Sequence, residues 1–80
     1  MTILVRVDGA ALREARQDAG YTRRILAVDA GISFTDVGLM ERGAAGEVDA
    51  RVVDTLARLL DVPVERLAPV LAPTPNPVGR

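Results

Sequence analysis

The spacing of apolar residues predicts a helix over residues 50–60. Apolar positions recur there at intervals of three, three, one and three residues, which is the spacing of a buried stripe along one helical face. The stripe consists of Ala50, Val53, Leu56, Ala57 and Leu60. Asp49 precedes it as an N-cap, and the sequence Asp61-Val62-Pro63 ends it.

A second helix is expected over residues 9–18. Asp8 stands before it as an N-cap, and Gly20 follows it as a left-handed stop. Leu12 and Ala15 share one face of this helix. We expect that face to turn toward the core.

Two short helices joined by a tight turn are expected between Thr22 and Gly43. Thr22 caps the first helix and Gly31 ends it. Ser33 caps the second helix, and Asp36 three residues later completes a capping box in which Asp replaces the usual Glu or Gln. The residues expected to point inward are Ile25, Leu26, Ala30, Ile32, Val37 and Met40. This pattern predicts a helix-turn-helix.

The two ends of the chain carry weaker patterns. Residues 2–7 alternate, with Ile3, Val5 and Val7 on one side, which predicts a short strand in need of a partner. Residues 44–48 are expected to form a loop. A short fifth helix is expected over residues 64–71, carrying Leu67 inward.

These expectations give an all-α domain of five helices over residues 9–71. An N-terminal strand or arm over residues 1–8 precedes the domain. Residues 72–80 contain Pro73, Pro75 and Pro77, which is typical of an extended, disordered tail.

Composition argues against an enzyme or a metal protein. The chain has no cysteine and no histidine, so it lacks a disulfide framework, a Cys/His zinc site and the side chains of Cys or His catalysis. The carboxylates Glu41, Glu47, Asp49 and Asp54 are interpreted as a cap, a pair and a solvated face rather than as an acid/base dyad. We expect no enzymatic activity and no cofactor.

Charge and hydropathy narrow the class of partner. The net charge is −1 and every one of the ten basic residues is arginine, so there is no global positive field, although a local basic edge still supplies phosphate contacts. No apolar run reaches the length of a membrane span, and the N-terminal residues lack the order of a secretory signal. We expect a cytoplasmic protein with no membrane partner.

The stretch from Leu12 to Leu67 resembles the lambda-repressor-like, XRE-type (Cro/repressor) helix-turn-helix family, without a gap between Thr22 and Gly43. The matching residues are Leu12, Arg13, Arg16, Gly20, Tyr21, Thr22, Leu26, Ala27, Gly31, Ile32, Ser33, Val37, Met40, Glu41, Arg42, Gly43, Leu56, Ala57, Leu60, Val62 and Leu67. The resemblance implies that the small Ala27 lets the two helices of the motif approach closely. It also implies a structural ion pair between Arg16 and Glu41.

The same resemblance implies contacts with the DNA backbone. Arg23 occupies the position where family members usually carry Gln, and Arg24 follows it at a helix N-terminus that itself favours a phosphate. Arg42 lies at the far end of the second helix of the motif. We expect Thr22, Arg23, Arg24 and Arg42 to contact the backbone, although two arginines at a helix end are also compatible with an ordinary solvated surface.

The base-contacting positions of the family fall on Phe34, Thr35, Asp36, Gly38 and Leu39, where polar side chains are typical. Thr35 alone is a conventional base-contacting residue. Phe34 and Leu39 offer contact only to a thymine methyl, Asp36 repels phosphate unless it accepts from cytosine, and Gly38 contacts no base. Two other interpretations of Phe34 and Leu39 stay open: burial in the core, or an exposed patch that binds protein.

Two functions are therefore weighed. The first is a sequence-specific transcriptional regulator that binds double-stranded operator DNA as a homodimer, joined through the N-terminal strand or the fifth helix. The second is a helix-turn-helix reused as a protein-interaction module, with Phe34, Gly38 and Leu39 forming the contact and little or no DNA binding.

Overall fold

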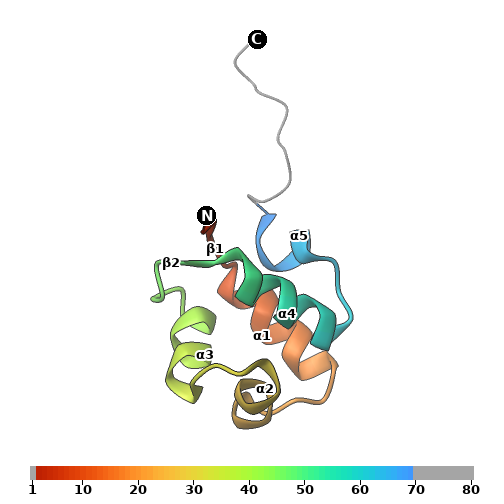
Figure 1. Ribbon diagram of the computed structural model, residues 1–80. Helices are drawn as coiled ribbons and strands as arrows, with labels where there is room; N and C mark the ends of the chain where they lie inside the picture. Colours follow the sequence, from red (N-terminus) through yellow and green to blue (C-terminus); the bar gives the residue numbers. More distant parts are fainter. Residues whose placement is uncertain (1, 70–80) are drawn as a thin grey trace.

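The computed structural model describes residues 2–69, in which five helices surround one core and a two-stranded sheet closes one end (Figure 1). The elements in chain order are β1 (Leu4–Arg6), α1 (Gly9–Asp18), α2 (Arg23–Ala30), α3 (Phe34–Glu41), β2 (Glu47–Asp49), α4 (Ala50–Leu60) and α5 (Val64–Leu67). Figure 1 shows α2 at the end of the domain opposite to the two strands. The predicted tail over residues 72–80 lies outside the described residues.

Four predicted N-caps are confirmed by hydrogen bonds from backbone N–H groups to the capping side chains. Asp8 accepts from Ala11 at 3.1 Å, and Thr22 accepts from Ile25 at 3.1 Å. Ser33 accepts from Asp36, and Asp49 accepts from Arg51, each at 2.9 Å. Because an N-cap uses only groups within one turn, these helix starts follow from local sequence.

The core collects the predicted inward faces of the helices. Its fully buried side chains include Leu12 of α1, Leu26 of α2, Val37 of α3, Leu56 of α4 and Leu67 of α5. The stripe of α4 is confirmed, since Val53, Leu56, Ala57 and Leu60 are buried and Ala50 packs partly against them. Each helix thus contributes one apolar side to a shared centre.

The prediction that Ile25 points inward is wrong, because 51% of its surface is exposed. Leu26 and Ala27 are the buried residues of α2, and Ala30 is half-buried beside them. One residue advances a helix by about 100°, so Ile25 lies about 150° from a face centred between Leu26 and Ala27, toward the outer side of the helix. The small Ala27 is 3% exposed, and α2 packs on both α3 and α4.

The prediction of a loop over residues 44–48 is wrong at its end, because residues 47–49 form β2. This strand pairs with β1 in antiparallel register, with Val5 opposite Val48. Val5 is buried and Val48 packs partly against the core, whereas Ile3 is exposed. The predicted N-terminal strand therefore finds its partner within the chain. A strand of three residues is too short to show a period-two pattern, so no local pattern predicted β2.

The fifth helix is shorter than the predicted 64–71. It ends at Leu67, because Ala68 leaves the helical region with a φ of −140°. Pro69 follows, and the residue before a proline is biased toward extended backbone. The helix still places Leu67 in the core, and the backbone carbonyl of Leu67 accepts a 2.7 Å hydrogen bond from the N–H of Asp8.

The start of α1 lies directly against the end of α3. A Cβ added at Gly9 would come within 2.5 Å of the Met40 carbonyl oxygen, which is a backbone atom that cannot move without moving the helix. Gly9 is therefore required by the close approach of two helices and not by its φ angle. The sequence pattern, which treats Gly9 only as the first residue of a helix, did not indicate this.

The predicted ion pair between Arg16 of α1 and Glu41 of α3 is present. Arg16 donates through Nε to Oε2 at 2.5 Å and through Nη2 to Oε1 at 3.2 Å, so the contact is bidentate. A third nitrogen of Arg16, Nη1, donates to the Tyr21 carbonyl at 2.9 Å. The two side chains are only 8% and 4% exposed, and neither charge has water as a substitute partner.

We predict opposite effects for the same substitution at two helical glycines. Gly9→Ala should lower the free energy of unfolding by about 2 kcal/mol, since the new methyl group collides with backbone. Gly38→Ala is the matched control: its Cβ would meet only the flexible end of Arg42, at 3.2 Å, so the gain in helix propensity should raise stability by up to about 1 kcal/mol. Urea denaturation measures both. Changes of the same sign at the two sites would contradict the close approach.

A second prediction concerns the buried carboxylate. Glu41→Gln keeps the shape of the side chain but leaves Arg16 as a buried charge without a counter-charge, so the free energy of unfolding should fall by roughly 3 kcal/mol. Asp54→Asn removes a carboxylate that pairs with Arg58 on the exposed side of α4, and this control should cost about 0.5 kcal/mol or less. If urea denaturation gave equal losses of unfolding free energy for the two variants, the buried pair would contribute no more to stability than the exposed one.

Candidate nucleic-acid interface

The first turn of α2 presents two arginines at the surface. Thr22 caps the helix, and Arg23 and Arg24 are its first two residues. The N–H groups of a first helical turn have no partner within the helix and carry a partial positive charge, which favours an anion at this position. The positive charges of the two arginines and the backbone dipole of α2 thus both favour an anion at this helix end.

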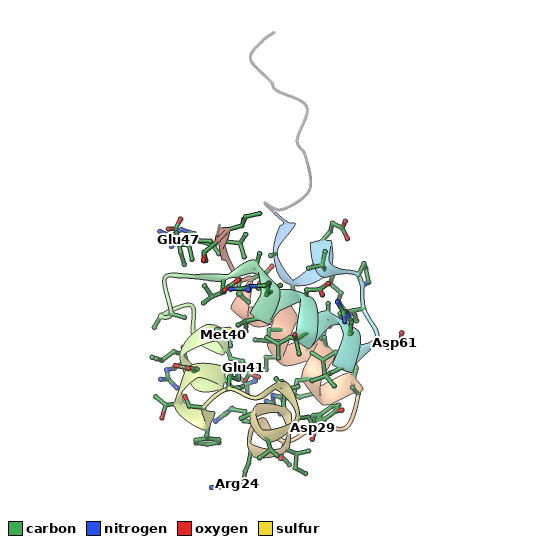
Figure 2. The ribbon with its side chains drawn as sticks, in the orientation of Figure 1. Arg24, Asp29, Met40, Glu41, Glu47 and Asp61 are labelled. Atoms are coloured by element: carbon green, nitrogen blue, oxygen red, sulfur yellow. The ribbon has the colours of Figure 1, made fainter. Side chains whose placement is uncertain are left out.

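Arg23 is held on one side by the carboxylate that also binds Arg16. Its Nε donates to Oε1 of Glu41 at 3.3 Å, while 42% of the Arg23 side chain remains exposed. Figure 2 shows Glu41 inside the domain, in agreement with its burial. Arg23 is therefore oriented by an internal contact and still reaches solvent. The sequence did not indicate this second partner of Glu41.

Arg24 packs on the aromatic ring of Phe34, the first residue of α3. Its guanidinium carbon lies over the ring at 5.2 Å from the centroid, within the range of a cation–π contact. Phe34 is 47% exposed, so its predicted alternative of burial in the core is wrong. Figure 2 shows Arg24 projecting outward from the end of the domain that α2 forms. The contact joins the N-terminal turns of the two helices of the motif.

These side chains border one open hollow of about 560 Å³. Its lining residues are Arg16, Tyr21, Thr22, Arg23, Arg24, Ile25 and Phe34. No acidic side chain is among them, and the lining combines arginines with apolar and aromatic groups. Partial burial raises the pKa of the Tyr21 phenol, and the carboxylate of Asp29 raises it further, so Tyr21 stays neutral. The hollow suits an anionic ligand that also has an apolar surface.

The remaining base-contacting candidates do not join this hollow. Thr35 and Asp36 are exposed on α3, and Leu39 is half-buried. Asp36 and Leu39 line a separate hollow of about 230 Å³, together with Ile32, Met40, Ala44, Ala45, Val48 and Val52. Gly38 is buried, and the guanidinium of Arg42 lies over it. Residues close in sequence on α3 thus face two different hollows.

Three side chains at the first hollow were missing from the sequence-based set of site residues. Arg16 was expected only in a structural ion pair, Tyr21 only as a residue that matches the family, and Ile25 in the inward face of its helix. A helical-wheel projection centred on Leu26 and Ala27 would have placed Ile25 toward the outer side of the helix. The position of Tyr21 depends on Arg16, whose Nη1 binds the Tyr21 carbonyl, and no local pattern shows that contact.

Three of the four carboxylates considered for acid/base chemistry have structural partners, namely Glu41, Asp49 and Asp54. Asp49 caps α4 and pairs with Arg51 at 2.9 Å, and the hydrogen bonds from Arg51 hold the pKa of Asp49 below its usual value. Asp54 pairs with Arg58, and Glu41 binds two arginines. Within residues 2–69, no group of three or more acidic side chains is placed to hold a metal ion. No helix in the same range has the length and apolarity needed to cross a membrane.

Comparison with known proteins connects this geometry to a family. A model of the helix-turn-helix domain matches residues 9–70, which is more than half of the chain. Among curated proteins, none matches the sequence.

Three solved structures are similar to the chain. The restriction-modification controller protein C.AhdI from Aeromonas hydrophila is 33% identical, with a TM-score of 0.67, over 72% of this chain and 86% of that one. The clp gene regulator ClgR from C. glutamicum is 36% identical, with a TM-score of 0.63, over 70% of this chain and 71% of that one. SinR, the master regulator for biofilm formation, in complex with DNA, shares the fold at 24% identity, with a TM-score of 0.67, over 71% of this chain and 90% of that one.

The domain model and the similarity to C.AhdI and ClgR indicate the same motif as the structure. The structure shows that motif in its helix caps, its turn and the Arg16–Glu41 pair. The chain belongs to the lambda-repressor-like, XRE-type helix-turn-helix family.

Proposed function

We propose that the protein is a transcriptional regulator that binds double-stranded operator DNA in a sequence-specific manner, with α3 in the major groove. It is a binding domain and not an enzyme. The observation that carries the proposal is the hollow without acidic groups in which Arg23 and Arg24 of α2 stand beside Phe34 of α3. SinR, which has the same fold, is solved in complex with DNA, and C.AhdI and ClgR are a controller and a gene regulator.

The α2 terminus supplies the contact to the DNA backbone. Arg23 and Arg24 are oriented by internal contacts, so little side-chain freedom is lost when a phosphate binds. Thr22 and the free N–H groups of the first turn add hydrogen-bond partners. With a net charge of −1, the protein has little general attraction to DNA, and binding depends on this local site.

The first turn of α3 supplies the contact to the bases. In helix-turn-helix proteins the N-terminal residues of the second helix approach the base edges. Phe34 and Thr35 hold those positions and are exposed, and Asp36 is exposed beside them, where it accepts from a cytosine amino group. Leu39 and Gly38 contribute less, because one is half-buried and the other lies under Arg42. Arg42, at the far end of α3, contacts the backbone there.

The regulator acts as a homodimer on two half-sites about one helical turn, roughly 34 Å, apart. β1 already has a partner in β2, so it does not need the second subunit to complete a sheet, although no strand within residues 2–69 pairs with its other edge. Either that edge or α5 forms the dimer surface. A cytoplasmic location goes with this proposal, because the regulator has to reach its operator DNA.

The second candidate is a protein-interaction module that uses Phe34, Gly38 and Leu39. Exposure of Phe34 favours it. The three residues do not form one patch, however, since Arg42 covers Gly38 and Leu39 lines a different hollow from Phe34. The arrangement therefore favours DNA as the ligand of this face.

The salt dependence of DNA binding tests the proposal. For DNA from upstream of its own gene, the double variant Arg23→Ala/Arg24→Ala should bind more weakly and should flatten the log–log dependence of affinity on salt by about 1.8 units, since two phosphate contacts are lost. Fluorescence anisotropy over a salt series measures the slope.

Arg51→Ala/Arg58→Ala is the matched control for that experiment. It removes the same charge from exposed side chains of α4, 82% and 77% exposed, and should leave the slope close to that of the wild type. Wild-type protein that binds no DNA even at low salt would refute the regulator and leave the protein-interaction module as the working hypothesis.

A further inference from the structure

The feature that the proposed function leaves unexplained is a phenyl ring at the surface, in the position where this motif meets the bases. Phe34 is one of two aromatic residues in the chain, and 47% of its surface is exposed. It directly follows the Ser33 cap, so it is the first residue of α3 and its backbone position is fixed by that cap. A ring without a donor or an acceptor cannot distinguish bases by hydrogen bonds.

The contact with Arg24 fixes the ring from the other helix. The guanidinium carbon of Arg24 stands 5.2 Å from the ring centroid, so one face of the ring is occupied by a cation. Both side chains border the same hollow, whose apolar wall includes Ile25, which is 51% exposed. The free surface of the ring therefore opens on a space that is apolar on one side and cationic on the other.

The chemistry of the major groove decides what fits such a space. Thymine is the only base that presents a methyl group there, and apolar side chains recognise it by contact. The phosphates on either side of that thymine carry the negative charge that suits the guanidinium of Arg24. A thymine methyl beside a phosphate matches both halves of the Phe34–Arg24 pair.

We propose that Phe34 is a specificity-determining residue that selects thymine through its C5-methyl group, and that Arg24 is the positioning residue that holds the ring in place. The inference rests on the proposed function, because it assumes that α3 enters the major groove. It goes further by naming the base, the chemical group on that base and the pair of side chains that recognises it. Arg23, although adjacent to Arg24, is held by Glu41 and takes no part in this selection.

Replacement of thymine by uracil, which lacks only the methyl group, tests the proposal. The wild-type protein first selects binding sites from a random library of duplex DNA. The selected duplex is then synthesised with thymine or with deoxyuridine, and the ratio of the two dissociation constants is measured. Each methyl group in contact with Phe34 should give about a fourfold preference for the thymine duplex, because the burial of one methyl group is worth roughly that factor.

Four variants and one control assign that preference to the two side chains. Phe34→Ala should bring the ratio toward one, and Phe34→Leu should keep part of the preference, since leucine still offers an apolar contact. Arg24→Ala should lower both the affinity and the ratio, whereas Arg23→Ala should weaken both duplexes equally and leave the ratio unchanged. Val28→Ala, which truncates a 74% exposed apolar side chain of α2 outside the lining of that hollow, should change neither quantity.

The outcomes separate this inference from the proposed function. If the wild type selects no DNA sequence at all, the proposed function fails and the inference fails with it. If it selects a sequence but shows the same affinity for the two duplexes, only the inference is overturned. A ratio that is unchanged in Phe34→Ala also overturns it, because the preference would then come from another side chain. Circular dichroism confirms that each variant is folded, which the exposure of Phe34 and Arg24 favours.

Discussion

At the end of α3, the buried carboxylate of Glu41 accepts hydrogen bonds from Arg16 of α1 and from Arg23 of α2. Three helices meet at this group, and its side chain is 4% exposed. A carboxylate removed from water needs strong partners, and a bidentate arginine provides them with a fixed geometry. Because Arg16 also binds the Tyr21 carbonyl, the same contacts fix the segment that leads into α2.

The orientation of the two helices of the motif follows from this arrangement. Glu41 holds the C-terminal end of α3, while the absence of a side chain at Gly9 allows α1 to lie against the backbone of the same turn. The small Ala27 is buried in α2, and α2 packs on α3. With these three contacts in place, the N-terminal turns of α2 and α3 meet at one hollow, and Arg24 reaches Phe34.

The atypical residues of α3 have different physical explanations. Gly38 has no side chain and leaves room for the guanidinium of Arg42 against the helix. Leu39 is half-buried at the second hollow. The guanidinium of Arg24 covers part of the apolar surface of Phe34. The face is therefore divided: its first turn is available to a ligand, and the turn after it is largely occupied by the protein itself. A polar residue in each of these positions would have made α3 a more general base-contacting helix.

Much of the domain could be predicted from local sequence. Asp8, Thr22, Ser33 and Asp49 start their helices through hydrogen bonds to N–H groups two or three residues away, and such contacts depend on no distant part of the chain. The stripe of α4 repeats often enough to fix its buried face. The Arg16–Glu41 pair was expected because a family resemblance carries information about contacts between helices.

What only the tertiary structure decided lies between elements. Some of these features join residues many positions apart: the pairing of β2 with β1, the close approach at Gly9, and the contacts of Arg23 with Glu41 and of Arg24 with Phe34. The exposure of Ile25 depends on how α2 is oriented against the helices beside it. A short element has too few residues to show a periodic pattern of apolar positions. A side chain at the edge of a helical face is buried or exposed according to what packs beside it. The sequence by itself determined where the helices of the motif begin and end; the packing of α1 and α3 around Glu41 decided which of their side chains face a ligand.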